Sequence, residues 1–122
     1  MTTEKEQQEI RNNLKDFTGT ENYYKIPLSK FNHTDGINHL IRTCGCWWLI
    51  SDTAIYLSSL KKYPDFLILT IKVNEDKTAL ITLKEDTDLK PIYEKKYNYT
   101  DFPLNEFEFY IINNVFLLTS EY

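Results

Sequence analysis

The chain has 122 residues, of which 42% are hydrophobic and 15% aromatic, and its formal net charge is −4. This length and composition predict one domain that buries roughly two-thirds of its unfolded surface, and they exclude a largely disordered chain. No apolar run has the length of a membrane span and the N-terminus is polar, so we expect neither a membrane span nor a signal peptide, and a cytoplasmic location.

The charge is unevenly distributed along the chain. Residues 1–62 hold 8 Lys or Arg and 7 Asp or Glu, whereas residues 63–122 hold 6 Lys and 11 Asp or Glu. General nucleic-acid binders present a basic face, so we expect no generic DNA binding. Two interpretations of the acidic half stay open: it binds a basic protein surface, or its carboxylates lie in solvated turns that keep a small domain soluble.

The first expected element is a helix over residues 1–16. Thr3 and Glu6 have the spacing of a capping box, which marks the start of a helix. Its apolar stripe is narrow and consists of Ile10, Leu14 and Phe17. After a glycine turn, residues 25–28 should be extended, because Pro27 disfavours helical backbone at the preceding residue.

The central helical region should cover residues 34–62, and the rest of the chain should pack around its apolar stretch 44–60. Thr34 or Asp35 is expected to cap its first part, and Gly45 to interrupt it. Trp47 and Trp48 point about 100° apart on a helix, so we expect one in the core and the other in a second contact, such as the N-terminal segment. The neighbouring Cys44 and Cys46 should be reduced, buried packing residues.

From residue 66 the pattern changes to alternation, which predicts an antiparallel meander over residues 66–119. Its strands are expected at 66–73, around 79–83, at 91–99, at 106–112 and at 115–119, the last two joined by a tight turn at Asn113-Asn114. The single domain 1–122 should therefore be α+β, with two or three N-terminal helices packed on one face of a C-terminal antiparallel sheet of about five strands.

Catalytic and metal-binding patterns are weak in this sequence. His33, Asp35, His39, Cys44 and Cys46 lie close together but lack zinc-site spacing, and thiols in so apolar a stretch should have raised pKa values. No glycine-rich phosphate loop accompanies the acidic residues 85–88, which favours a solvated turn over a magnesium site. We therefore expect no enzyme activity, no metal and no cofactor.

Tyrosines provide the remaining signal for an interface. Tyr93, Tyr97 and Tyr99 alternate along one predicted strand, where they form either an exposed contact surface or one covered face of the sheet. RNA-stacking platforms need interleaved cations, and the acidic neighbours weaken that interpretation. The candidate partner-binding residues are Glu85, Asp86, Asp88, Tyr93 and Tyr97.

Several short segments together resemble an uncharacterised family of small proteins of bacteria, phages and plasmids over roughly residues 14–122. The matching segments are Phe17-Thr-Gly-Thr, Tyr23-Tyr24, Thr34-Asp35-Gly36, Trp48-Leu49 with Asp52, Lys72-Val73, Tyr99-Thr-Asp-Phe-Pro-Leu104 and Ser120-Glu121-Tyr122. The resemblance implies a mobile-element setting, and some similar proteins are anti-CRISPR candidates against type VI RNA-guided effectors.

On this basis we expect a non-enzymatic inhibitor in the bacterial cytoplasm. Its expected partner is a defence protein such as a CRISPR RNA-guided nuclease, with or without guide RNA, bound at or near the basic RNA channel. Two other classes stay open. One is a self-associating phage or plasmid module, for example a homodimer formed through the edge of the tyrosine-bearing strand; the other is an enzyme of unrecognised type that depends on His33, His39 or Asp52.

Overall fold

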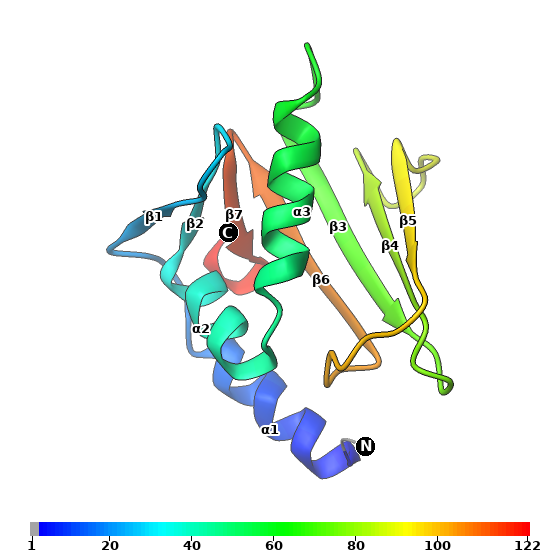
Figure 1. Cartoon of the computed structure of the whole chain (residues 1–122). Helices are drawn as coiled ribbons and strands as arrows, with labels where there is room; N and C mark the ends of the chain where they lie inside the picture. Colours follow the sequence, from blue (N-terminus) through cyan, green and yellow to red (C-terminus); the bar gives the residue numbers. More distant parts are fainter. Residues whose placement is uncertain (1–2) are drawn as a thin grey trace.

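The computed structural model describes residues 3–122, which form three helices and one seven-stranded sheet (Figure 1). The predicted α+β class is confirmed. The helices precede the five strands of the C-terminal half, and two short strands lie between the first helix and the second. In chain order the elements are α1 (Glu4–Lys15), β1 (Tyr23–Lys25), β2 (Asn32–Thr34), α2 (Asp35–Cys44), α3 (Trp47–Ser58), β3 (Phe66–Val73), β4 (Ala79–Lys84), β5 (Tyr93–Tyr97), β6 (Glu106–Ile112), β7 (Val115–Leu118) and the 3₁₀ turn η1 (Thr119–Glu121).

The sheet extends beyond the five expected strands because β1 and β2 join it. Each has three residues, and β2 pairs in parallel with β7 while every other pair is antiparallel. All three residues of β1 are exposed, so its sequence carries no alternation of apolar and polar side chains. Such a strand is defined by pairing with its neighbour, which a local pattern does not reveal.

The order of the strands also differs from that of a meander. It is β1-β2-β7-β6-β3-β4-β5, so β6 lies beside β3 and not beside β5. The chain leaves β5, crosses the end of the β3–β4 hairpin and returns on the far side of β3, which is a Greek-key order for β6-β3-β4-β5. The longest strand, β3, thereby gains a partner along each edge.

The predicted boundary signals have their expected roles. Thr3 and Glu6 form the capping box of α1, and the Thr34 hydroxyl accepts a hydrogen bond from the backbone N–H of Ile37 at the start of α2. Gly45 ends α2 in the left-handed region at φ 62°, where a side chain would be strained. Asn113 and Asn114 both have positive φ, as a two-residue hairpin turn requires.

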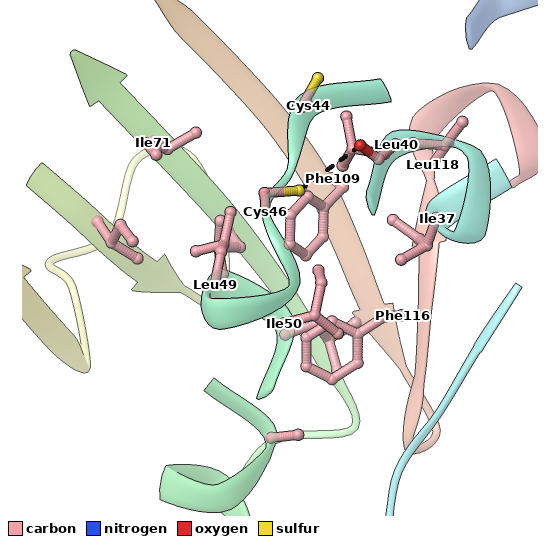
Figure 2. Close-up of a cluster of buried hydrophobic side chains, with 14 of the residues drawn as sticks. Ile37, Leu40, Cys44, Cys46, Leu49, Ile50, Ile71, Phe109, Phe116 and Leu118 are labelled. Atoms are coloured by element: carbon pink, nitrogen blue, oxygen red, sulfur yellow. Dashed lines mark hydrogen bonds between the residues drawn. The ribbon is translucent and has the colours of Figure 1, made fainter. Parts of the chain in front are cut away.

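The hydrophobic core lies between α2 and α3 and the sheet face that these helices cover (Figure 2). Cys46 is fully buried there, and its Sγ lies 3.7 Å from the carbonyl oxygen of Leu40. The alternation predicted for the sheet is confirmed, because alternate residues of β3, β4, β6 and β7 point into this layer. They are Leu67, Leu69, Ile71, Ala79, Ile81, Leu83, Phe109, Ile111, Phe116 and Leu118.

The placement expected for the two tryptophans is only partly right. Neither fills the core: Trp47 is 40% exposed and Trp48 is half-buried, while Leu49, Ile50 and Leu57 are fully buried. The second contact is made with β2, where the Trp47 ring meets that of His33 edge-on at 6.2 Å. A helix that is apolar on nearly every side does not identify its own buried face, and packing against the sheet decides it.

Candidate partner-binding site

Helix α3 and the edge strand β5 face each other through three pairs of side chains, which we call the α3–β5 ladder. Trp48, Asp52 and Tyr56 lie four residues apart on α3 and meet Tyr97, Lys95 and Tyr93 of β5 respectively. Four helical residues rise about 6 Å and two strand residues about 6.6 Å, so the two spacings match along the contact. The ladder attaches β5, the edge strand of the sheet, to the central helix α3.

The outer rungs of the ladder are aromatic. The ring centroids of Tyr56 and Tyr93 lie 4.0 Å apart in a stacked arrangement, and those of Trp48 and Tyr97 lie 4.8 Å apart at 62°. Both strand tyrosines are therefore half-buried against the helix. Of the two open interpretations of the tyrosine row, the covered face applies to Tyr93 and Tyr97, whereas Tyr99 is 71% exposed beyond the end of β5.

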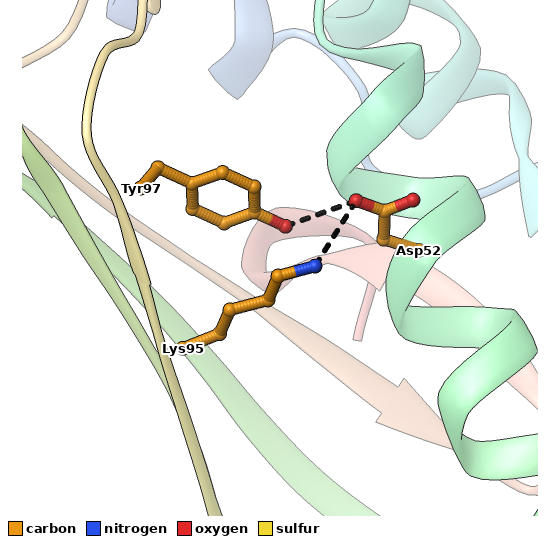
Figure 3. A network of polar contacts seen from close by, with 3 residues as sticks. All are labelled: Asp52, Lys95 and Tyr97. Carbon is orange, nitrogen blue, oxygen red and sulfur yellow. Dashed lines mark hydrogen bonds and ion pairs between the residues drawn. The ribbon is translucent and has the colours of Figure 1, made fainter.

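The middle rung is polar (Figure 3). The carboxylate oxygen Oδ2 of Asp52 accepts a hydrogen bond from the Tyr97 hydroxyl at 3.1 Å and lies 3.6 Å from Nζ of Lys95. Burial, followed by the charge of Asp52, raises the pKa of Tyr97, so this phenol stays protonated and acts as a donor. Because the side chains of Asp52 and Lys95 are 45% and 43% exposed, solvent screens their ion pair.

The acidic turn, Glu85–Asp88, joins β4 to β5 and is exposed at every residue. Among residues 3–122 its three carboxylates form no ion pair with a lysine or arginine, and Asp86 instead accepts a hydrogen bond from the backbone N–H of its neighbour Thr87 at 2.6 Å. The adjoining Leu89 and Ile92 are 50% and 41% exposed. The turn thus presents unpaired negative charge beside apolar side chains.

The structure brings the five candidate residues to one edge of the sheet without gathering them into one cluster. Tyr93 follows the acidic turn closely at one end of β5, whereas Tyr97 lies four residues further on, about 13 Å away at the rise of a strand. Within residues 3–122, β5 pairs only with β4, so its other edge is open (Figure 1). The acidic turn and this open edge are available to a partner, while the two tyrosine rings mainly bind the chain's own helix.

The histidines and cysteines considered as catalytic or metal-binding candidates are engaged in packing. His33 is buried and stacks on Tyr24, and desolvation lowers its pKa. His39 contacts the Phe17 ring at 5.1 Å. Burial raises the pKa of the Cys44 thiol to about 12, and it also raises the pKa of the Cys46 thiol, as expected for such an apolar stretch. Within residues 3–122, no three His, Cys, Asp or Glu side chains converge as metal ligands.

Sequence reasoning missed a polar cluster at the start of α2, which we call the α2 latch. The Glu121 carboxylate accepts hydrogen bonds from the Thr34 hydroxyl at 2.6 Å, the Gly36 backbone N–H at 3.1 Å and the Leu118 backbone N–H at 2.9 Å. Ser120 donates to the carbonyl oxygen of Phe17 at 2.6 Å. The residues of the latch lie in segments that carry the family resemblance, and this was the only signal for the latch in the sequence. The hydrogen bonds of the latch give those segments a structural role.

Comparison with known proteins gives one family. A family model described as "Family of unknown function (DUF6876)" matches residues 8–122, which includes most of α1. No curated protein matches, and no solved structure does.

None of the helices within residues 3–122 combines the length and apolarity needed to cross a bilayer.

Proposed function

We propose that this chain, which belongs to the DUF6876 family of unknown function, is a non-enzymatic protein that binds and inhibits a bacterial defence nuclease. In its finer form the proposal names the target as a type VI CRISPR RNA-guided effector, bound at or near its basic RNA channel. Membership of an uncharacterised family was expected from the sequence; the inhibitory role rests on the arguments that follow.

The observation that carries the proposal is the acidic turn. Its carboxylates are exposed and unpaired within residues 3–122, and they lie in the turn that leads into β5, the edge strand of the described sheet. An RNA channel is lined by cations, so a cluster of free carboxylates attracts it over the range of the Debye length and opposes RNA binding there. The open edge of β5 adds main-chain groups that pair with an extended segment of a partner.

The test is inhibition of a purified type VI effector. The wild-type chain should bind the effector and reduce its RNA cleavage, and the triple variant Glu85→Lys, Asp86→Lys, Asp88→Lys should lose most of that binding. The matched control reverses three exposed carboxylates elsewhere, Glu9→Lys, Asp16→Lys and Glu75→Lys, and should bind as the wild type does. Unchanged binding by the acidic-turn variant would refute the assignment of this surface.

Affinity capture from the native host identifies the partner independently. Near-stoichiometric recovery of a CRISPR effector supports the inhibitor proposal, and loss of the effector after RNase treatment indicates that guide RNA forms part of the bound surface. Recovery of the chain alone contradicts inhibition.

A second candidate function is self-association of a phage or plasmid module. The observation that favours it is an aromatic cluster on the sheet face opposite α2 and α3, where Phe66, Tyr110 and Tyr122 have ring centroids 5.2–6.0 Å apart and Tyr122 is 77% exposed. A homodimer would give a mass that rises with concentration in light scattering. Tyr110→Lys should then restore the monomer, whereas a constant monomeric mass rejects this candidate.

A further inference from the structure

A hollow of about 340 Å³ opens at the end of β5 that lies away from the acidic turn. We call it the Trp48 hollow; its lining residues are Trp48, Tyr97, Tyr99, Thr100 and Asp101. Three of these five side chains are aromatic and one is a carboxylate, and none is a cation. This volume is near the lower end of the range for ligand pockets, so it suits a single side chain better than a large ligand.

Hydrogen bonds fix the backbone of the segment 99–101 in the lining of the hollow, while the side chains of Tyr99 and Asp101 remain exposed. Thr100 is buried, its backbone N–H donates to the carbonyl oxygen of Lys77 at 2.8 Å, and its hydroxyl accepts from the backbone N–H of Phe102 at 3.1 Å. On either side of it, Tyr99 is 71% exposed and Asp101 is exposed. A rigid segment thus presents one aromatic ring and one carboxylate to solvent beside the Trp48 ring.

The charges around the hollow select the chemistry of its ligand. Asp101 lines it and Asp52 lies next to Tyr97, so a phosphate or carboxylate would be repelled, and Lys95 is already paired with Asp52. A purely apolar ligand would desolvate the Asp101 carboxylate without giving it a partner. A cation suits both the aromatic rings and the carboxylate of the hollow, because the faces of aromatic rings attract positive charge and Asp101 would form an ion pair with the cation. The same chain shows the contact on a small scale, with Lys95 Nζ 4.9 Å from the centre of the Tyr97 ring.

We propose that the Trp48 hollow binds the guanidinium group of an arginine side chain on a protein partner. Arginine fits better than lysine because its planar group stacks on aromatic rings and is weakly hydrated. This inference rests on the proposed function, because the arginine would belong to the same basic partner surface that the acidic turn approaches. The hollow and the turn lie at opposite ends of the open edge of β5, so one partner surface reaches both.

The test uses the isolated chain and a capped arginine tripeptide, Ac-Gly-Arg-Gly-NH2, with the citrulline tripeptide as an uncharged match. The two tryptophan indole N–H signals in an NMR spectrum, assigned with a Trp47→Phe variant, give an internal control. The Trp48 signal should shift saturably with the arginine peptide while the Trp47 signal, on the far side of the helix start near His33, stays in place. Citrulline should cause little shift.

Two exposed residues of the hollow supply variants that should fold normally. Tyr99→Ala should weaken binding of the arginine peptide about two- to five-fold, the range expected for an exposed cation–aromatic contact. Asp101→Asn should weaken it by up to about five-fold, the range expected for an exposed ion pair. Tyr23→Ala is the matched control, because Tyr23 is a 63% exposed tyrosine on the opposite edge strand. Equal binding of citrulline, no shift of the Trp48 signal, or wild-type affinity in both variants overturns the proposal.

The outcome is separable from that of the proposed function. If the peptide binds as expected but reversal of the acidic turn leaves effector binding unchanged, the hollow stands and the inhibitor proposal fails. If effector binding depends on the acidic turn but the peptide results are negative, the inhibitor proposal stands and the hollow is not an arginine site.

Discussion

Gly36 shows how one missing side chain permits the α2 latch. A Cβ placed on Gly36 would overlap Glu121 Oε1 and lie 2.7 Å from Cδ1 of Leu118. The carboxylate therefore reaches the start of α2 only because residue 36 has no side chain. Negative charge at a helix N-terminus is favourable, so the latch stabilises α2 as well as the chain end that supplies it.

Gly36→Ala should lower the free energy of unfolding by about 1–3 kcal/mol, because the added methyl displaces Glu121 and Leu118 from a packed site. Chemical denaturation monitored by tryptophan fluorescence gives the value. Gly19→Ala is the matched control, since apart from its chain neighbours no atom of residues 3–122 lies within 4 Å of a Cβ at that position, and it should change stability by no more than about 0.5 kcal/mol. Equal effects of the two substitutions would show that the latch does not depend on the close approach.

Asp35 makes part of the stability depend on pH. Its carboxylate accepts hydrogen bonds from the backbone N–H groups of Glu21 and Asn22 and from the Tyr24 hydroxyl, and these bonds, that from Glu21 first, lower its pKa below the ordinary value of 3.8. A lowered carboxyl pKa contributes stability that is present above the unfolded-state value and is lost as pH falls through the native value.

Asp35→Asn should therefore be less stable than the wild type at pH 7, and the difference should shrink as the pH falls below 3.8. Urea denaturation of both proteins at pH 7 and at low pH measures it. Asp16→Asn serves as control, because the Asp16 side chain accepts no hydrogen bond from residues 3–122. A difference for Asp35→Asn that is constant over the whole pH range would contradict the assigned contacts.

Between elements, the α3–β5 ladder is the contact that attaches an edge strand to the core helix. Its aromatic rungs and its polar rung contribute differently, because the polar rung is nearly half exposed and its ion pair is screened. The outer rungs are stabilised by the burial of their aromatic rings, and the stacking of Tyr56 on Tyr93 contributes stabilisation beyond that burial.

A double-mutant cycle on Tyr56→Ala and Tyr93→Ala should give a coupling energy of about 0.5–1.5 kcal/mol in the free energy of unfolding. The cycle on Asp52→Ala and Lys95→Ala should give a smaller value, about 0–1 kcal/mol, that falls with added salt. Denaturation curves of the wild type, the single variants and the double variants supply both numbers. Additive effects at Tyr56 and Tyr93 would mean that the ladder does not hold β5 to the helix.

For the molecule as a whole, the concentration of carboxylates in the C-terminal half makes association with a basic partner sensitive to salt. Under the proposed function, the association rate with a type VI effector should fall as ionic strength rises, since exposed charges are screened beyond about 10 Å at 0.1 M. Stopped-flow or surface-binding kinetics at several salt concentrations measure it. The acidic-turn variant should show a flatter dependence, and equal slopes for variant and wild type would locate the attraction elsewhere on the chain.

Local patterns predicted much of this molecule. The caps at Thr3 and Thr34, the break at Gly45, the inward residues of β3 and β4 and the Asn113-Asn114 turn all depend on a few neighbouring residues, so the amino-acid order is enough to specify them. The exposed acidic turn also followed from its composition. These features are local, and the tertiary structure does not alter them.

Contacts between distant segments required the tertiary structure. The strand order around β3, the incorporation of β1 and β2, the face of α3 that enters the core, and the half-buried state of Tyr93 and Tyr97 each depend on a partner far away in the chain. The α2 latch and the Trp48 hollow join segments up to 103 and 53 residues apart, respectively. Composition and periodicity report which side chains tend to be buried, but side-chain packing across the whole domain decides which neighbours bury them.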